Sequence, residues 1–171
     1  MELLIEPMDS PIGTLLVACD GQDLHALDYA DGEPRMLALL RRRYPVLRLA
    51  SGGAPAAIRA GLQAYFAGDV QAITTLPVET GGTAFQQRVW DALRALPAGV
   101  PQTYGALAAR LARPSASRAV GQANARNPVA IVIPCHRLIG ANATLAGYAG
   151  GLARKRWLLA HEGVFWPPDA R

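Results

Sequence analysis

Cys135, one of only two cysteines in the chain, lies in the segment IPCHRLIG (133–140), directly before His136 and Arg137. A cysteine attacks only as its thiolate, so a working nucleophile needs a base or a positive charge nearby to lower its pKa. The residues alone leave two interpretations open. Cys135 is either a small side chain at the end of an apolar run or a nucleophile with His136 as its base.

A catalytic base usually needs an orienting partner, and carboxylates are scarce in the second half of the chain. Residues 83–166 contain only Asp91 and Glu162. Asp91 falls early in a predicted surface helix. Glu162 falls in the last turn of a helix predicted from about Leu152, where its charge opposes the helix dipole. A residue that breaks a local rule invites a functional explanation. We therefore treat Cys135, His136 and Glu162 as a candidate chain of nucleophile, base and orienting group.

The composition limits the class of protein. A chain of 171 residues is long enough for one domain with a sizeable core or for two small domains packed together. No apolar run approaches the length of a membrane span, and the acidic start MELLIEPMDS does not resemble a signal peptide. Cys19 and Cys135 lie too far apart for a disulfide framework, so we expect reduced thiols in a cytoplasmic protein.

Charge is distributed unevenly along the chain. Residues 1–82 carry six arginines and ten acidic residues, a net charge of −4. Residues 83–166 carry nine arginines and one lysine against two acidic residues, a net charge of +8. This pattern is typical of a back half that binds a polyanion, but also of a solvated, arginine-rich surface. The acidic front half is not expected to contact a polyanion directly.

The front half reads as strands followed by helices. Residues 3–32 predict three short antiparallel strands with turns at Ser10-Pro11 and Asp20-Gly21. Helices are predicted over 34–44 and 55–66. The segment TLPVETGGT (75–83) is the best boundary because the charge balance changes sign there, and it divides the chain into lobes 1–80 and 81–171.

The back half is predicted to be mostly helical. Thr83 can cap a helix to about residue 96, and two shorter helices joined by the turn RPS (113–115) give a helix-turn-helix pattern. The second of these, ASRAVGQANAR (116–126), has mostly small side chains, which suits either tight packing or close approach to a groove. A buried strand is predicted over 130–133, and the loop 141–151 suits one wall of a pocket. The terminal WPPDAR is expected to fray.

Longer stretches around Cys135 carry a specific resemblance. The segments RAVGQANARNPVAIVIPCHRLIG, GYAGG and WLLAHEG resemble the O6-alkylguanine-DNA alkyltransferases, which repair DNA by direct reversal, without a gap over about 83–163. SPIGTLLV, YFAGD and TLPVETGGT in the front half are similar to the bacterial members. The resemblance implies an α+β fold. A ribonuclease-H-like lobe with a three-stranded antiparallel sheet and helices would precede a helical lobe with a helix-turn-helix.

The resemblance also implies the activity of a methylated-DNA–protein-cysteine S-methyltransferase that reacts once. Cys135 would accept the alkyl group from O6 of guanine and become a thioether, an irreversible change. His136 would take the thiol proton through a water molecule, with Glu162 holding His136 in the required tautomer. Tyr104 matches the family tyrosine that donates to the guanine ring as it leaves.

Further family positions concern substrate and DNA. Arg118 matches the arginine that fills the gap left by the rotated nucleotide. Asn127 matches the hinge asparagine between the recognition helix and the active-site segment. Tyr148 would line the base pocket, and Lys155 matches a lysine at its edge. Arg137 is assigned to the same substrate- and DNA-binding set. An alkylated O6 lies within the stacked duplex, so the base must be flipped out before sulfur can reach it.

The partner implied is double-stranded DNA carrying an alkylated guanine and bound through the minor groove, with O4-alkylthymine left open as a second lesion. We expect a cytoplasmic monomer that needs no cofactor and binds no membrane. Some family members hold a structural zinc through Cys and His. Cys19 and His25 fall near two such positions, but no further Cys or His lies in residues 1–82, so no metal is expected.

Three positions depart from the family pattern. Ala146 and Ala149 stand where relatives often carry a polar side chain, and Asn124 stands where some have a larger apolar residue. The breadth of substrates is therefore left open.

Two other classes of function remain to be separated. A DNA-binding module without chemistry would use the helix-turn-helix but would not need Cys135. A cysteine hydrolase would turn over repeatedly and would have no use for a basic helix-turn-helix. The stoichiometry of thiol alkylation distinguishes all three.

Overall fold

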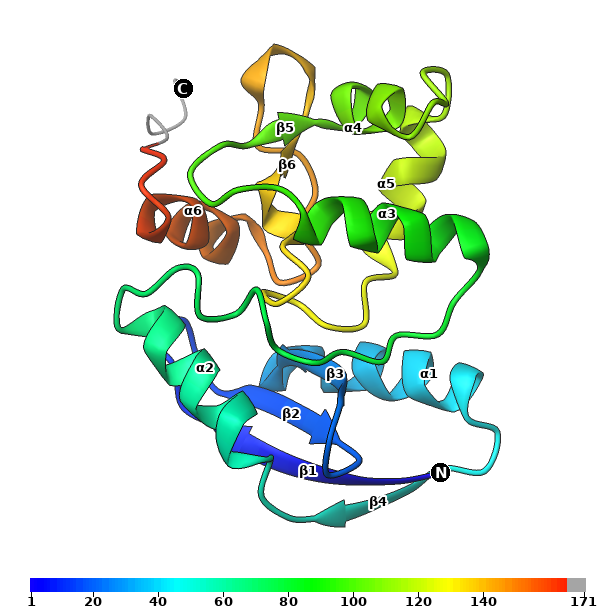
Figure 1. Ribbon diagram of the computed structural model, residues 1–171, viewed down its shortest axis with the longest axis vertical. Coiled ribbons are helices and arrows are strands. Elements are labelled where there is room, and N and C mark those ends of the chain that lie inside the picture. The colour runs from blue at the N-terminus through cyan, green and yellow to red at the C-terminus, as the bar shows by residue number, and fades with distance from the viewer. Residues whose placement is uncertain (166–171) are drawn as a thin grey trace.

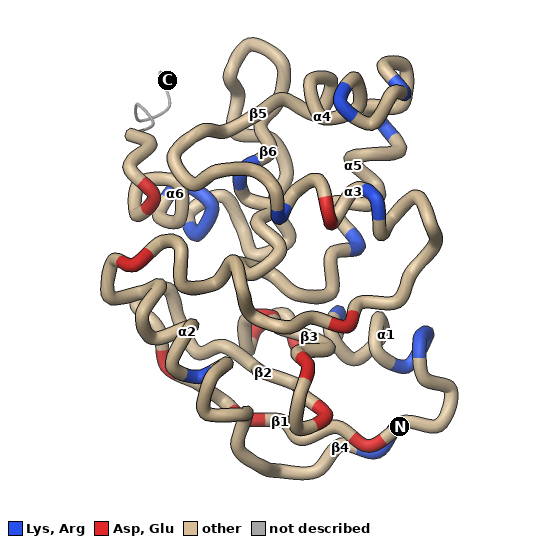
Figure 2. Tube along the Cα trace, in the orientation of Figure 1, with Lys and Arg blue, Asp and Glu red and all other residues tan. Residues whose placement is uncertain are grey.

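The computed structural model describes residues 1–165, so the segment WPPDAR at 166–171 lies outside the described residues. Two lobes are stacked along the long axis of the molecule, with the N-terminal sheet at one end and the helical C-terminal part at the other (Figure 1). Most of the acidic residues belong to the N-terminal lobe (Figure 2).

The N-terminal lobe is built on a four-stranded sheet with the strand order β3-β2-β1-β4. Its strands are β1 (Glu2–Met8), β2 (Leu15–Cys19), β3 (Leu24–Tyr29) and β4 (Arg48–Ser51). The first three strands form the predicted antiparallel meander. β4 pairs in parallel with β1 and was not predicted. Its four residues are mostly exposed and show no apolar alternation, so the sequence carries no strand signal there.

Two helices cover the sheet. They are α1 (Glu33–Arg43), after the 3-10 turn Ala30–Gly32, and α2 (Ala56–Phe66). Successive side chains of a strand point to opposite faces. Val17 and Cys19 of β2 pack in the core that contains α2, whereas Ala18 packs against Met36 of α1. The sheet is therefore covered on both faces, and its α2 face also contacts the C-terminal lobe.

The C-terminal lobe contains α3 (Ala84–Arg94), α4 (Tyr104–Arg110), α5 (Ser117–Ala125) and α6 (Leu152–His161). A two-stranded parallel sheet joins β5 (Gln102–Thr103) to β6 (Leu138–Ile139). The 3-10 turns Cys135–Arg137 and Ala141–Ala143 flank β6. The helices α4 and α5 contact each other in the predicted helix-turn-helix order. The α+β class is thus confirmed.

The edge strand β3 joins the lobes through its backbone. Leu24 forms a β-bridge with Val78 of the boundary segment 75–83, the linker between the lobes. Leu27 forms a β-bridge with Val129, in the segment that leads to Cys135. The amide of Leu27 donates to Pro128 at 3.0 Å, and the amide of Ala130 donates back to Leu27 at 2.8 Å. The N-terminal lobe therefore fixes the backbone just before Cys135.

The strand predicted over 130–133 is wrong. This segment forms a buried series of turns between Pro128 and Pro134, and Ile131 has a φ of 72°. A branched side chain in the left-handed region is strained and persists only where its surroundings enforce it. The apolar run reflects burial rather than extended backbone.

Among the described residues, none of the helices combines the length and apolar character needed to cross a membrane.

The start of α3 offers a test of local stability. Thr83 accepts from the amide of Gln86 at 3.2 Å, and the Gln86 side chain accepts from the amide of Thr83 at 2.9 Å, which completes a capping box. We expect Thr83→Ala to lower the free energy of unfolding by about 1 kcal/mol, measured by urea denaturation. Thr83→Ser retains the hydroxyl and should lose less than half of that. Equal losses in the two variants would show that the cap is not responsible.

Candidate active site

Cys135 begins a 3-10 turn behind Pro134 and lines a cavity of about 200 Å³. Its side chain is almost fully buried. The cavity is smaller than the roughly 300 Å³ at which pockets for drug-sized ligands begin, so it suits one small group. The other lining residues come from both lobes: Arg35, Tyr104, Gly121, Asn124, Ala125, Asn127, Ala130, Gly147, Tyr148, Ala149 and Gly150.

His136 is held by Glu162 in one tautomer. Its Nε2 atom lies 2.8 Å from Oε1 of Glu162, and both side chains are fully buried. An ionised carboxylate can only accept, so Nε2 carries the hydrogen and Nδ1 carries the free lone pair. Among residues 1–165, Nδ1 is buried and has no hydrogen-bond partner. The arrangement leaves His136 able to accept a proton at Nδ1.

Glu162 is saturated with hydrogen bonds. Its Oε1 accepts from the hydroxyl of Tyr65 at 2.9 Å and from Nη2 of Arg137 at 2.9 Å, and its Oε2 accepts from Nε of Arg137 at 2.8 Å. Arg137 also donates to the carbonyl of Leu96 and is only 2% exposed. From the sequence, Arg137 is assigned to the substrate- and DNA-binding set. Its burial corrects that assignment, because its guanidinium faces Glu162 and the core rather than the surface.

The electrostatics follow from burial and pairing. Burial alone would raise the pKa of Glu162, but the hydrogen bonds from His136 and Arg137, together with the positive charge of Arg137, lower it to about 2. Burial lowers the pKa of His136, although Glu162 opposes the shift. Burial likewise raises the pKa of Cys135. At neutral pH the site therefore holds a charged Glu162 beside a neutral imidazole and a neutral thiol.

Asn127 ties together the turns before Cys135. Its Nδ2 donates to the carbonyl of Ile133 at 2.8 Å, and its Oδ1 accepts from the amide of Val129 at 2.9 Å. The side chain closes the segment 127–133 into a ring directly after α5, at the position expected of a hinge.

Tyr104 and Asn124 also line the cavity. Tyr104 is the first residue of α4, and burial raises its pKa, so its hydroxyl stays protonated. Asn124, on α5, is 8% exposed, and its Oδ1 has no hydrogen-bond partner among the described residues. Sequence reasoning noted Asn124 only as a departure from the family pattern, yet it supplies a buried acceptor in the cavity wall.

One wall of the cavity, the loop wall, is formed by Gly147, Tyr148, Ala149 and Gly150 of the loop 141–151, and Lys155 lies behind it. Lys155 does not line the cavity, unlike the pocket-edge position expected for it, and is fully buried. Its Nζ donates to carbonyl oxygens of Leu138, of Ala146 at 2.7 Å and of Gly147 at 3.3 Å. Burial lowers its pKa to about 8. Lys155 therefore shapes the loop from behind.

Arg118 lies on the exposed side of α5 together with Ala119, Gln122 and Ala125. The opposite side of the helix, with Val120 and Ala123, is buried in the core. The small residues of α5 therefore fit both interpretations of this helix. Ala123 allows tight packing in the core, and Ala119 and Ala125 leave a smooth outer face that could approach a groove.

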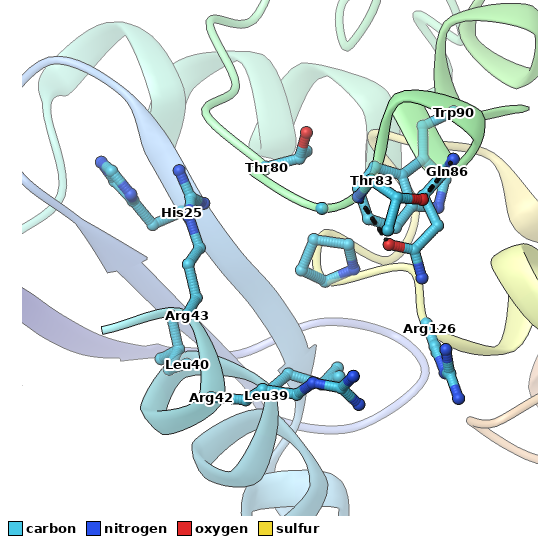
Figure 3. A pocket seen from close by; sticks show the side chains of 12 residues that line it. His25, Leu39, Leu40, Arg42, Arg43, Thr80, Thr83, Gln86, Trp90 and Arg126 are labelled. Atoms are coloured by element: carbon cyan, nitrogen blue, oxygen red, sulfur yellow. Dashed lines mark hydrogen bonds between the residues drawn. The ribbon is translucent and has the colours of Figure 1, made fainter. Parts of the chain in front are cut away.

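A second hollow, of about 220 Å³, lies between α1 and the start of α3 and does not include Cys135. Figure 3 shows Arg42 from α1 and Arg126 on opposite sides of it, with Thr83 and Trp90 above. His25 borders this hollow and bonds Tyr44 at 2.7 Å, whereas Cys19 is buried in the core. In the described part of the chain, no group of three or more His, Cys, Asp or Glu is placed to hold a metal ion.

Two residues of the N-terminal lobe reach the site that sequence reasoning did not include. Arg35, on α1, lines the cavity, and Tyr65, on α2, bonds Glu162. Arg35 lies 100 residues and Tyr65 lies 70 residues before Cys135, in helices whose patterns indicate only a core face. No local signal could have found them.

Comparison with known proteins gives concordant matches. Residues 3–80 match the family model for the ribonuclease-like domain of 6-O-methylguanine DNA methyltransferase, and residues 84–164 match that for its DNA binding domain. The chain is 49% identical over 166 residues to the methylated-DNA–protein-cysteine methyltransferase of Salmonella typhimurium, covering 95% of this chain and 97% of that protein.

Solved structures agree with this. The O6-methylguanine methyltransferase of Mycobacterium tuberculosis superposes with a TM-score of 0.77 at 39% identity, covering 98% of this chain and 96% of the other. A structure of the M. tuberculosis protein described as OGT in complex with DNA has a TM-score of 0.76 at 39% identity, covering 95% and 92%.

The buried carboxylate predicts a specific dependence of stability on pH. We expect Glu162→Gln to lower the free energy of unfolding by about 3 to 5 kcal/mol at pH 7, because it leaves the buried Arg137 without its counter-charge. The folded-state pKa of Glu162 is depressed from 4.5 to about 2. Its contribution is therefore complete above pH 4.5 and is lost as pH falls towards 2. The gap between wild type and variant should narrow over that range in denaturation curves.

Glu79→Gln is the matched control. Glu79 pairs with Arg43, but its side chain is 54% exposed, so the loss should be about 1 kcal/mol or less. If the gap for Glu162→Gln stayed constant down to pH 3, Glu162 would not be the ionised partner of Arg137.

Proposed function

The chain belongs to the 6-O-methylguanine DNA methyltransferase family, and on that premise we propose that Cys135 is the residue that accepts the alkyl group. The protein binds DNA and acts in direct-reversal repair as a methylated-DNA–protein-cysteine methyltransferase. The observation that carries the assignment to Cys135 is the 2.8 Å contact of Glu162 with His136, the residue that directly follows Cys135, and Cys135 itself lines a cavity of about 200 Å³.

The first step is removal of the thiol proton. His136 accepts it at Nδ1, directly or through a water molecule, while its Nε2 hydrogen stays bonded to Glu162. The resulting imidazolium is stabilised by the buried carboxylate, which lowers the cost of forming a thiolate in a dry site. Arg137 and Tyr65 hold Glu162 in place and do not touch the reacting atoms.

The second step is an in-line displacement. The thiolate attacks the alkyl carbon, a carbon–sulfur bond forms, and the bond from that carbon to O6 of guanine breaks with its electron pair moving to the base. Tyr104 donates its hydroxyl proton as charge builds on guanine, since burial keeps that hydroxyl protonated. The unpartnered Oδ1 of Asn124 is suited to accept from an N–H group of the base. The thioether is stable, so each molecule reacts once.

The substrate is an alkylated guanine rotated out of double-stranded DNA. The outer face of α5 supports this, because Ala119 and Ala125 allow close approach to a minor groove and Arg118 is long enough to enter the stack. Contacts to phosphate should make binding tolerant of sequence and sensitive to salt. One chain supplies the whole set of groups, which supports action as a monomer.

The division into lobes 1–80 and 81–171 is also proposed here. Support comes from the two family matches, which meet at the linker between them. A DNA-repair protein of this family that lacks a membrane-spanning helix among its described residues is proposed to act in the cytoplasm.

Alkyl transfer can be tested by intact-protein mass spectrometry after mixing with excess duplex that contains O6-methylguanine. We expect the mass of one methyl group on the peptide that bears Cys135 and no reaction beyond one equivalent. Cys135→Ala should remain unmodified. Cys19→Ala is the matched control and should react like wild type, because Cys19 is buried in the sheet core with a pKa raised to about 11.

The other outcomes separate the alternatives. Unmodified wild type that still bound the duplex would leave a lesion-binding module and would remove Cys135 from the chemistry. Repair beyond one equivalent would indicate a turnover enzyme.

The role of Arg118 predicts a difference between duplex and free base. We expect Arg118→Ala to slow transfer from duplex DNA about 10- to 100-fold, because the extruded nucleotide costs a few kcal/mol of stacking that nothing then replaces. Reaction with free O6-benzylguanine needs no extrusion and should be unchanged. Rates are measured by single-turnover alkylation. Arg41→Ala, on the exposed face of α1, is the control. Equal slowing with both substrates would contradict insertion of Arg118 into the stack.

A further inference from the structure

The hydroxyl of Tyr148, the aromatic residue of the loop wall, bonds to the other lobe. It lies 2.9 Å from the hydroxyl of Tyr29, the last residue of β3. The two rings meet edge to face, with centroids 6.3 Å apart. The wall beside Cys135 is therefore attached to the edge strand of the N-terminal sheet.

The wall borders more than one cavity. Ala149 and Gly150 line both the cavity of Cys135 and a third cavity, of about 250 Å³. The third cavity is also bordered by Tyr29, Asp31 and Arg154. Because two cavities adjoin this stretch of backbone, packing alone does not fix it, and its position depends on polar contacts and on the few rings that it touches.

Gly150 brings the wall onto Tyr29. A Cβ atom at this position would overlap the rings of both Tyr29 and Tyr148. The absence of a side chain lets the backbone of the wall rest directly on the Tyr29 ring. Tyr29 thus contacts the wall through its ring as well as through its hydroxyl.

Arg154 secures the same contact from α6. Its guanidinium carbon lies 4.1 Å from the centroid of the Tyr29 ring. Nη1 donates to both carboxylate oxygens of Asp31 at 2.9 Å and to the carbonyl of Gly150 at 3.2 Å, while Nε donates to the carbonyl of Ile12 at 2.9 Å. One arginine therefore joins three places in the N-terminal lobe to the backbone of the wall.

We propose that Tyr29 is a positioning residue for alkyl transfer: its hydroxyl fixes Tyr148, and through it the pocket wall that aligns the substrate with Cys135. This inference rests on the proposed function and assigns the N-terminal lobe a part in it. In-line displacement is sensitive to geometry, and a misplacement of about 1 Å can slow a reaction by about 100-fold. Tyr29 does not line the cavity itself, so it acts on the reaction only through the wall.

The test uses Tyr29→Phe, which removes one hydroxyl and keeps the ring under Gly150 and Arg154. We expect the single-turnover rate constant for alkyl transfer at saturating duplex to fall about 10-fold. This is less than the roughly 100-fold loss for a misplacement of about 1 Å, because the ring of residue 29 still supports the wall. The dissociation constant for the duplex should stay within about twofold, because the α5 surface is unchanged.

Tyr44→Phe is the matched control. Tyr44 also lies in the N-terminal lobe and its hydroxyl bonds a buried partner, Nδ1 of His25 at 2.7 Å, but it borders neither cavity beside the wall. We expect it to transfer alkyl at the wild-type rate and to lose at least as much stability to urea as Tyr29→Phe. If both variants transferred alkyl equally slowly, the lower rate would come from a general loss of stability, and the proposal would be overturned.

A double-mutant cycle tests whether Tyr29 acts through Tyr148. If the two hydroxyls form one functional contact, Tyr29→Phe combined with Tyr148→Phe should react no more slowly than Tyr148→Phe alone. The proposal is overturned if the two rate losses multiply, or if Tyr29→Phe reacts as fast as a wild type that transfers alkyl normally. Failure of the wild type itself to alkylate Cys135 would instead remove the proposed function, and this inference with it.

Discussion

One buried carboxylate, that of Glu162, organises the C-terminal lobe. Its two oxygens accept from His136, Tyr65 and Arg137, and Arg137 also donates to the carbonyl of Leu96, just after α3. Taking a charge out of water is costly unless the charge is paired and fully hydrogen-bonded, and here it is both. The group that orients the proposed base is thus the group that joins α2, α6 and the turn of Cys135. This explains why an acid is tolerated at the C-terminus of α6, where the helix dipole opposes it.

The second constraint is that both lobes hold the segment that contains Cys135. Its candidate catalytic side chains belong to the C-terminal lobe, but the backbone before Cys135 pairs with Leu27 of β3. The loop wall of the cavity contacts Tyr29 of the same strand. A strand at the edge of a sheet leaves a row of amides and carbonyls to be paired. Here the linker and the active-site segment pair them, so the edge is covered and the site is placed by the same bonds.

Sequence patterns predicted the elements that carry a local signal. The three strands between turn residues, the cap at Thr83 and the helical periods all correspond to observed elements. β4 is not predicted because its short, exposed sequence carries no apolar pattern. The run 130–133 predicts a strand because burial and extended backbone give the same apolar pattern. The basic residues Arg137 and Lys155 were expected near substrate, yet both are buried. Their sequence neighbours do not reveal that a distant carboxylate, or a set of loop carbonyls, compensates their charges.

The resting state of the site follows from the same burial. Cys135 and His136 are both neutral at physiological pH, because burial raises the pKa of the thiol and lowers that of the imidazole. A nucleophile that can be used only once is wasted by reaction with any stray electrophile, and a protonated thiol reacts far more slowly than a thiolate. In the proposed mechanism, proton transfer to Nδ1 becomes favourable only as the attack develops, when the imidazolium forms beside Glu162. On this proposal the buried ion pair of Glu162 and Arg137 acts in the transition state, while the thiol stays protonated until a nucleobase fills the cavity.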